Sequence, residues 1–275
     1  MKKILFVLSL LLFSGTIDAQ TKVVPIVDLK IRGLLGGVEN GKFLDAKTTV
    51  QKLAAEQNYK LFLPDGTSGN LLLKKPTNGQ DVCDDFYNLE MDTGGAAAEK
   101  RFDKGGIGMG LGYGWKPQPR SLKSIDLNNP EYKKIVNNFL RSKGITLPVA
   151  RLSQAIRADL DGDGQEEVLL SATRIVDYEK KNARTAYDEY SVVLLRKIIN
   201  GKPQNILLGG EFQPKSRGVY DGYQYSVSSV ADLNGDGRME IILYSAYYEG
   251  SDVQVFEMKR NKPVEVETLR VGCGV

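Results

Sequence analysis

The sequence contains no histidine. Histidine is the common general base near neutral pH, and its imidazole ring is a frequent zinc ligand. Its absence excludes Ser-His-Asp and Cys-His catalysis as well as His-ligated zinc sites. The sequence has no Ser-x-x-Lys motif either, so a lysine-activated serine lacks its signature. Pairs of Asp and Glu are the acid–base chemistry that remains.

Cysteine is also scarce, because Cys83 and Cys273 are the only two. Two residues are too few for a cysteine-rich zinc site. In an oxidising compartment the two cysteines are a candidate disulfide that would join the N-terminal part of the chain to its end. The alternative is two separate buried thiols.

The first nineteen residues have the pattern of a signal peptide. Lys2 and Lys3 precede an apolar run over residues 4–13, and Ala19 is a small residue before the expected cleavage site. The run is too short to span a bilayer, and no later stretch is a candidate membrane span. No cysteine follows the cleavage site, which argues against a lipid anchor. The sequence therefore predicts a secreted or periplasmic protein.

Neither charge sign predominates. Without residues 1–19, the remaining 256 residues carry 35 basic and 33 acidic side chains. Such a balance gives no electrostatic reason to expect binding to nucleic acid or to an anionic membrane.

An acidic, glycine-containing nonapeptide occurs twice, 73 residues apart. Its first copy is D-L-D-G-D-G-Q-E-E and its second is D-L-N-G-D-G-R-M-E. We call residues 159–167 loop 1 and residues 232–240 loop 2. Both run directly into apolar residues that are typical of buried strands. A hard cation such as Ca²⁺ needs six to eight oxygens, and alternating carboxylates and backbone carbonyls in a short loop supply them. Side-chain oxygens at loop positions 1, 3, 5 and 9 and the backbone carbonyl at position 7 are therefore the predicted Ca²⁺ ligands: Asp159, Asp161, Asp163, Gln165 and Glu167 in loop 1, and Asp232, Asn234, Asp236, Arg238 and Glu240 in loop 2.

These loops are not EF-hands, because positions 12, Leu170 and Leu243, fall inside predicted strands rather than on a helix with a bidentate Glu. The pattern D-x-[DN]-x-D-G-x-x-E before a strand resembles the cation loops of FG-GAP repeats, which occur in integrin α-subunit propellers and in bacterial VCBS-type surface proteins. The resemblance covers roughly the last 120 residues. Both copies have Glu at position 9, where those families more often have Asp.

An alternative is that both loops are ordinary Asp/Gly turns in which the side chains cap backbone N–H groups. Metal binding is favoured because carboxylates crowded around one turn repel each other strongly without a cation. Loop 2 has Asn234 where loop 1 has Asp161, so it has one charge fewer. The carboxylate count therefore predicts the weaker binding at loop 2.

The predicted fold is α+β and rich in β-structure. Residues 20–91 form a small α+β unit with a helix that begins at Asp45 and reaches about Gln57. Residues 92–122 are a Gly/Pro-rich linker, in which residues 105–114 alternate glycine with other residues and predict a loop or a closely packed strand. Residues 123–275 hold an amphipathic helix, capped by Asn129 and ended by Gly144, and then two loop–strand repeats. With only two repeats, we expect an incomplete propeller-like assembly of mostly antiparallel strands and not a closed ring.

The sequence favours an exported calcium-binding protein that acts as a binding or scaffold protein without catalysis, with an unknown protein or glycan ligand. A group of tyrosines near loop 2 could line the binding surface: Tyr220, Tyr223, Tyr225, Tyr244, Tyr247 and Tyr248. The alternative is a secreted, glycosidase-like hydrolase that uses a carboxylate pair and contains structural calcium.

Overall fold

The computed structural model describes residues 23–79, 83, 85–91, 102, 104–175, 188–213 and 222–274. Within these ranges the chain is rich in β-structure, as predicted, and every strand pairing is antiparallel. The predicted signal peptide, residues 1–19, lies outside them. No helix of the described part is both long and apolar enough to cross a membrane.

The strands form three sheets. The first sheet has the order β5 (Ser68–Lys74), β4 (Glu56–Phe62), β8 (Ile107–Gly110), β1 (Val24–Asp28), β2 (Gly33–Glu39), β7 (Tyr87–Asn88) and β6 (Thr77–Asn78), with β3 (Lys42–Asp45) also on β2. The second has the order β13 (Lys202–Gln213), β12 (Glu189–Ile199), β11 (Glu167–Arg174), β10 (Leu152–Ala158) and β9 (Lys123–Ser124). The third has the order β14 (Gln224–Ala231), β15 (Glu240–Tyr247), β16 (Gly250–Lys259) and β17 (Lys262–Glu265), with β18 (Val271–Gly274) also on β16.

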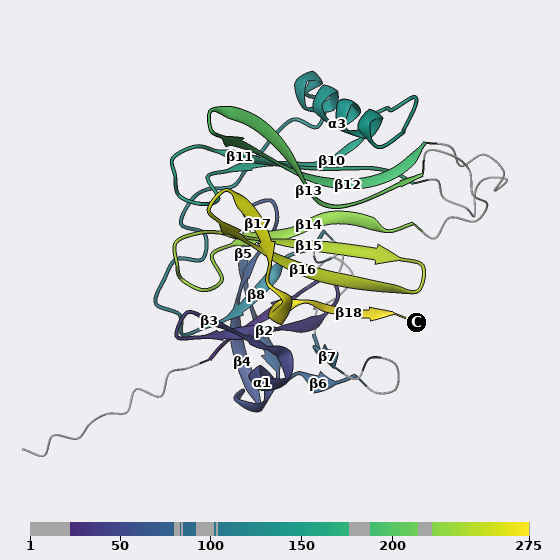
Figure 1. The fold of residues 1–275 in the computed structure, drawn as a ribbon. Coiled ribbons are helices and arrows are strands. Elements are labelled where there is room, and N and C mark those ends of the chain that lie inside the picture. Colours follow the sequence, from purple (N-terminus) through teal and green to yellow (C-terminus); the bar gives the residue numbers. More distant parts are fainter. Residues whose placement is uncertain are drawn as a thin grey trace, which may run out of the picture.

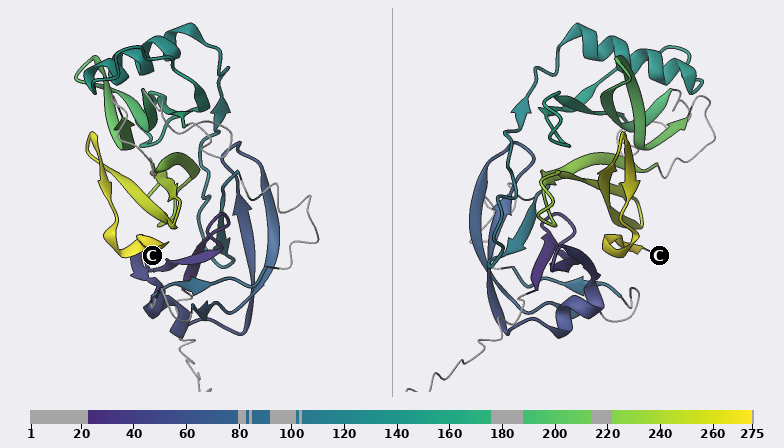
Figure 2. Two further views of the ribbon diagram at one scale, coloured as in Figure 1. Left: turned by 90° about the vertical axis from the view of Figure 1, so that its right-hand side faces the viewer. Right: turned by 60° about the vertical axis from the view of Figure 1, so that its left-hand side comes forward.

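The sheets are stacked, with the third sheet between the other two (Figures 1 and 2). Leu169 and Val193 of the second sheet pack with Ile241 of the third in one apolar cluster. On the opposite face of the third sheet, Ile242 packs in a cluster that contains Met109 of the first sheet. The sheets do not close into a ring, which agrees with the prediction. Their apolar faces are buried against one another instead, as layered β-proteins require.

Helix α3 (Pro130–Ser142) covers the outer face of the second sheet (Figure 1). The side chain of Asn129 accepts hydrogen bonds from the backbone N–H groups of the first turn, and Pro130 occupies that turn. Its buried side chains, Tyr132, Val136 and Leu140, lie on one face. Gly144 follows the helix with a φ of 88°, so the predicted start and end are confirmed.

Helix α1 (Ala46–Gln51) begins where the sequence predicts but ends earlier. Asp45 caps it by accepting a hydrogen bond from the Thr48 N–H at 2.6 Å. The prediction that it reaches about Gln57 is wrong, because residues from Glu56 onward form β4 and pair with β5. Strand pairing therefore overrides the helical spacing of the apolar residues here.

The predicted linker over residues 92–122 contains a central strand of the first sheet, so a linker is wrong there, whereas the closely packed strand, one of the two expectations for residues 105–114, is confirmed. Strand β8 pairs with both β1 and β4. A Cβ on Gly108 would lie 2.8 Å from a methyl group of Val27, and one on Gly110 would meet the ring of Pro25 at 2.5 Å. The alternating glycines are needed because neighbouring side chains pack directly on the β8 backbone.

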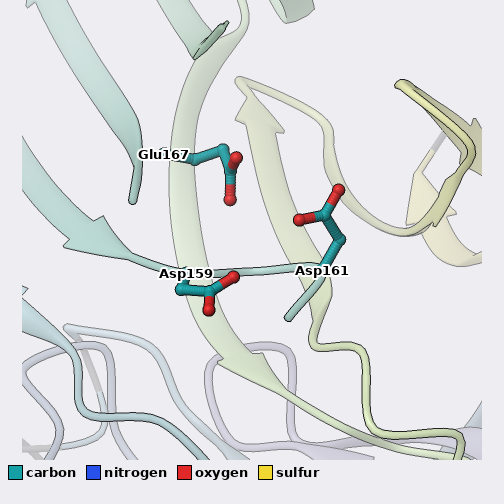
Figure 3. A group of neighbouring side chains, drawn as sticks. All are labelled: Asp159, Asp161 and Glu167. Carbon is teal, nitrogen blue, oxygen red and sulfur yellow. The ribbon is translucent and has the colours of Figure 1, made fainter. Parts of the chain in front are cut away.

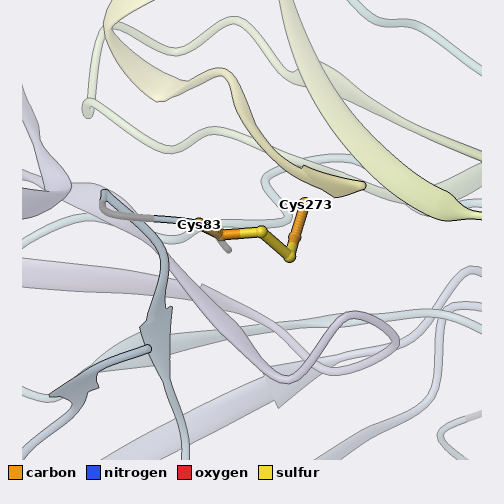
Figure 4. Close-up of a disulfide and its surroundings, with 2 residues drawn as sticks. All are labelled: Cys83 and Cys273. Carbon is orange, nitrogen blue, oxygen red and sulfur yellow. A yellow bond between two sulfur atoms is a disulfide. The ribbon is translucent and has the colours of Figure 1, made fainter. Parts of the chain in front are cut away.

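A disulfide joins Cys83 to Cys273 on β18, with Cα atoms 5.6 Å apart (Figure 4). This confirms the predicted pairing over the alternative of two free thiols. The bond links the N-terminal part of the chain to the third sheet across 190 residues of sequence. It is compatible with an oxidising compartment.

We expect the double substitution of Cys83 and Cys273 by serine to lower the free energy of unfolding by about 2–5 kcal/mol, because a crosslink over so long a loop restricts the unfolded chain. Urea denaturation under non-reducing conditions measures this difference. A reductant should destabilise the original protein to the same extent and leave the variant unchanged. Equal stability of the oxidised and reduced original protein would contradict the prediction.

Candidate metal centre

Loop 1 joins β10 to β11, and loop 2 joins β14 to β15. Each first aspartate accepts hydrogen bonds from the backbone N–H groups three and five residues later. The distances are 2.7 and 3.2 Å for Asp159, and 2.7 and 2.9 Å for Asp232. The donors are glycines with φ between 78° and 85°, a region that glycine adopts without strain. The two loops therefore share one backbone frame.

The glutamate at position 9 closes each loop from the start of the following strand. Glu167 accepts a hydrogen bond from the Leu160 N–H at 2.8 Å, and Glu240 accepts one from the Leu233 N–H at 2.7 Å. In both cases the acceptor is Oε2. The exposed fractions of these glutamates are 1 % and 0 %. Each loop thus buries a carboxylate, which is costly unless the charge is compensated.

In loop 1 the structure brings three of the predicted ligands together (Figure 3). Carboxylate oxygens of Asp159, Asp161 and Glu167 lie within 4.8 Å of one another, a spacing that could hold a metal ion. Asp163 is exposed, and its Oδ1 accepts the N–H of Gln165 at 2.8 Å. Gln165, at position 7, is also exposed.

Sequence reasoning missed Lys197, which belongs to β12. Its Nζ lies 2.6 Å from Glu167 Oε1, 2.9 Å from Asp161 Oδ2 and 3.5 Å from Asp163 Oδ2. The side chain is 1 % exposed. Burial alone lowers the pKa of the ammonium, but hydrogen bonds to Glu167 and Asp161 outweigh burial and raise that pKa. Lys197 is therefore a charged counter-ion for the carboxylates of loop 1. The only sequence signal was a lysine, next to Arg196, between the apolar residues of strand 189–199.

Loop 2 places its predicted ligands in the same frame but with different partners. Asp232 is buried and Asp236 is exposed. Asn234 Oδ1 accepts the Asp236 N–H at 2.9 Å. The Arg238 guanidinium donates to the Met258 carbonyl at 3.2 Å. Between residues that the structure describes, no ion pair joins a loop 2 carboxylate to a lysine or arginine.

Glu240 Oε1 is a buried acceptor that has no hydrogen-bond partner among the described residues. Burial raises the pKa of Glu240 to about 8, although the hydrogen bond from the Leu233 N–H opposes this. The charges of Asp236 and Asp232 raise the pKa further. An unpaired carboxylate oxygen at such a position normally requires an explanation, such as an ion.

Residues 115–120 hold the two loops side by side. Trp115 Nε1 donates to the Asp232 carbonyl at 2.9 Å. Arg120 donates to the Asp159 carbonyl, to the Leu160 carbonyl at 3.0 Å and to the Gly237 carbonyl at 2.8 Å. Its Nε also lies 3.8 Å from Asp159 Oδ2. This segment, predicted to be linker, therefore braces both candidate sites.

Three of the six predicted tyrosines meet at a cavity of about 420 Å³, at the opposite end of β14 and β15 from loop 2, which is lined by Tyr223, Tyr225, Tyr247, Asp252 and Arg270 among others. The Tyr223 and Tyr247 ring centroids are 4.7 Å apart, and an Arg270 nitrogen lies 3.4 Å from an Asp252 oxygen. The other members of the predicted group lie elsewhere: Tyr244 packs under the Lys30 ammonium, Tyr248 is 87 % exposed, and Tyr220 lies outside the described residues.

Comparisons of the chain with family models, with curated proteins and with solved structures found no match. The chemistry of the loops is therefore the guide to function.

We expect the stability of the protein in a chelator to fall as the pH rises from about 5 to about 9, and Glu240 to cause part of this fall. The pKa of its carboxyl is raised in the folded state. Its contribution to the free energy of unfolding is therefore complete below pH 4.5 and is lost as the pH rises through about 8. Glu240→Gln should remove that part. Urea denaturation at several pH values measures it, with exposed Glu249→Gln as the control. Parallel pH profiles for all three proteins would contradict the assignment.

Proposed function

We propose that this is an exported, secreted or periplasmic, calcium-binding protein that acts as a binding or scaffold protein without catalysis. The observation that carries the proposal is the buried Oε1 of Glu240, which has no partner among the described residues and lies in a loop with two further carboxylates. Ca²⁺ would supply the missing positive charge at that point.

The donors of loop 2 suit calcium better than a softer metal. Side-chain oxygens of Asp232, Asn234, Asp236 and Glu240, with the backbone carbonyl of Arg238, form a set made of oxygen alone. Hard oxygen ligands favour Ca²⁺ or Mg²⁺, and a flexible loop with several carboxylates favours the larger ion. An extracellular calcium module typically binds with a Kd of about 10⁻⁴–10⁻³ M.

The ion's role would be structural. It would join the end of β14 to the start of β15, beside the segment that braces both loops. The four consecutive strands β10–β13 and the four strands β14–β17 each pair in sequential order around one acidic loop. This supports the likeness to FG-GAP or VCBS repeats, with two stacked blade-like units of which the third sheet packs on the first.

The tyrosine-lined cavity is our proposed site for a glycan ligand. Sugars stack their C–H faces on aromatic rings and form hydrogen bonds with charged planar groups. Tyr223, Tyr247, Asp252 and Arg270 supply both kinds of contact in one hollow. A protein partner would need a larger apolar surface than this cavity presents.

We expect calorimetry to detect Ca²⁺ binding to the protein from which residues 1–19 have been removed, and excess Ca²⁺ to raise its Tm relative to EDTA. Asp236→Ala should abolish the binding at loop 2, whereas exposed Glu249→Ala should not change it. Trp115 is the only tryptophan and contacts loop 2, so terbium luminescence sensitised by tryptophan gives a local readout. An unchanged Tm and no binding heat in millimolar Ca²⁺ would refute the proposal.

We expect a glycan array to identify a ligand that the original protein binds and that Tyr247→Ala binds at least tenfold more weakly. Tyr248→Ala is the matched control, because Tyr248 is exposed and does not line the cavity. Equal losses in both variants would exclude the cavity as the site. Hydrolysis of the bound glycan would replace the scaffold interpretation with the hydrolase alternative.

A further inference from the structure

The two loops share a backbone frame but differ in the source of their positive charge. In loop 1 the Oε1 of Glu167 faces the Lys197 ammonium at 2.6 Å. In loop 2 the Oε1 of Glu240, whose Oε2 makes the equivalent hydrogen bond, has no partner among the described residues. The same atom is therefore neutralised by the chain in one loop and left without a counter-charge in the other.

We infer that Lys197 is the permanent counter-ion of loop 1, so that loop 1 needs no metal and loop 2 is the divalent-cation site of this protein. The inference rests in part on the proposed function, since it assigns the proposed calcium to one of two loops. It reverses the order of affinity that the carboxylate count predicts.

Loop 1 also has a buried acceptor without a hydrogen-bond partner among the described residues, Asp161 Oδ1, but the other oxygen of that carboxylate faces the Lys197 ammonium. Lys197 Nζ contacts two of the three residues, Asp161 and Glu167, whose oxygens cluster at metal-like spacing. A Ca²⁺ ion would need the same oxygens at about 2.3–2.6 Å. It could take them only if a charged side chain with 1 % exposure moved away from its partners. Displacing a paired buried charge in this way is strongly unfavourable.

The ion pairs of the loop carboxylates also support a metal at loop 2 rather than at loop 1. Loop 1 has four predicted carboxylate ligands, but Lys197 and Arg120 form ion pairs with them, which leaves a charge of −2. Loop 2 has three, Asp232, Asp236 and Glu240, and none of them forms an ion pair with a lysine or arginine between described residues, since the Arg238 guanidinium is at the Met258 carbonyl. Among the described residues the chain therefore supplies ion-pair partners to the carboxylates of loop 1 and not to those of loop 2.

The pairing of the strands shows why the two units differ. Val168 pairs with Arg196 in the second sheet, and Ile241 pairs with Phe256 in the third. Continuing each ladder by one residue sets Lys197 opposite the position 9 glutamate of loop 1. In the third sheet the same step sets Glu257 opposite Glu240. The second copy thus has an acidic residue where the first has its internal cation.

The test is the number of Ca²⁺ ions bound per chain, measured by equilibrium dialysis and calorimetry. The original protein should bind one ion, and Asp161→Asn should still bind one, because its loop does not use metal. Asp236→Ala should bind none. Lys197→Met removes the internal cation and should bind two, and the double variant Lys197→Met with Asp236→Ala should bind one, at loop 1.

Lys197→Met should also lower the Tm in EDTA by about 10 °C, because it leaves buried carboxylates unpaired, and millimolar Ca²⁺ should restore most of that loss. Lys202→Met is the matched control, since this lysine is exposed on the adjacent strand. Should Lys197→Met fail to fold, Asp161→Asn still decides the question.

Failure of this inference differs from failure of the proposed function. Two ions bound by the original protein, or a site lost in Asp161→Asn, would overturn the role of Lys197 and leave calcium binding intact. No ion bound by the original protein, with one bound by the double variant, would overturn calcium at loop 2 and support Lys197 as the internal counter-ion. One ion bound by Lys197→Met would also overturn the inference.

Discussion

The structure depends on the compensation of buried carboxylates where strands enter and leave the two acidic loops. Glu167 and Glu240 each close a loop from the first residue of a strand, and each is almost fully buried. A buried carboxylate is stable only with hydrogen bonds and a counter-charge. The backbone supplies the hydrogen bonds in both loops in the same way, so the counter-charge is the variable that distinguishes them.

The layered fold brings these charges together and fixes them. The third sheet is covered on both faces, and the loops meet where the Met239 N–H donates to the Leu160 carbonyl at 2.7 Å. Arg120 contacts backbone carbonyls of both loops. The first sheet is fastened to the third by a buried hydrogen bond of 2.6 Å from Ser228 to Asp28 and by the disulfide. The conformation of the two loops therefore depends on how the three sheets pack against one another.

Local patterns predicted the local elements well. The Asn129 cap and Gly144 correctly bounded α3, because capping and glycine conformation act within a few residues. The predicted end of α1 and the predicted linker around β8 were wrong for a common reason. Residues 56–57 and 107–110 take their conformation from strands distant in sequence, and pairing partners cannot be read from a window of one segment.

The sequence by itself determined the backbone frame of each loop, because the first aspartate, the two glycines and the glutamate at position 9 contact one another within nine residues. It also determined that the only disulfide available was Cys83–Cys273. Only the tertiary structure decided which carboxylates meet a cation from the chain. Lys197 lies 30 residues after Glu167 on another strand, and Glu257 lies 17 residues after Glu240, so the spacing alone does not align them. The reason is physical: electrostatic partners are set by proximity in the folded sheet, and strand register creates that proximity.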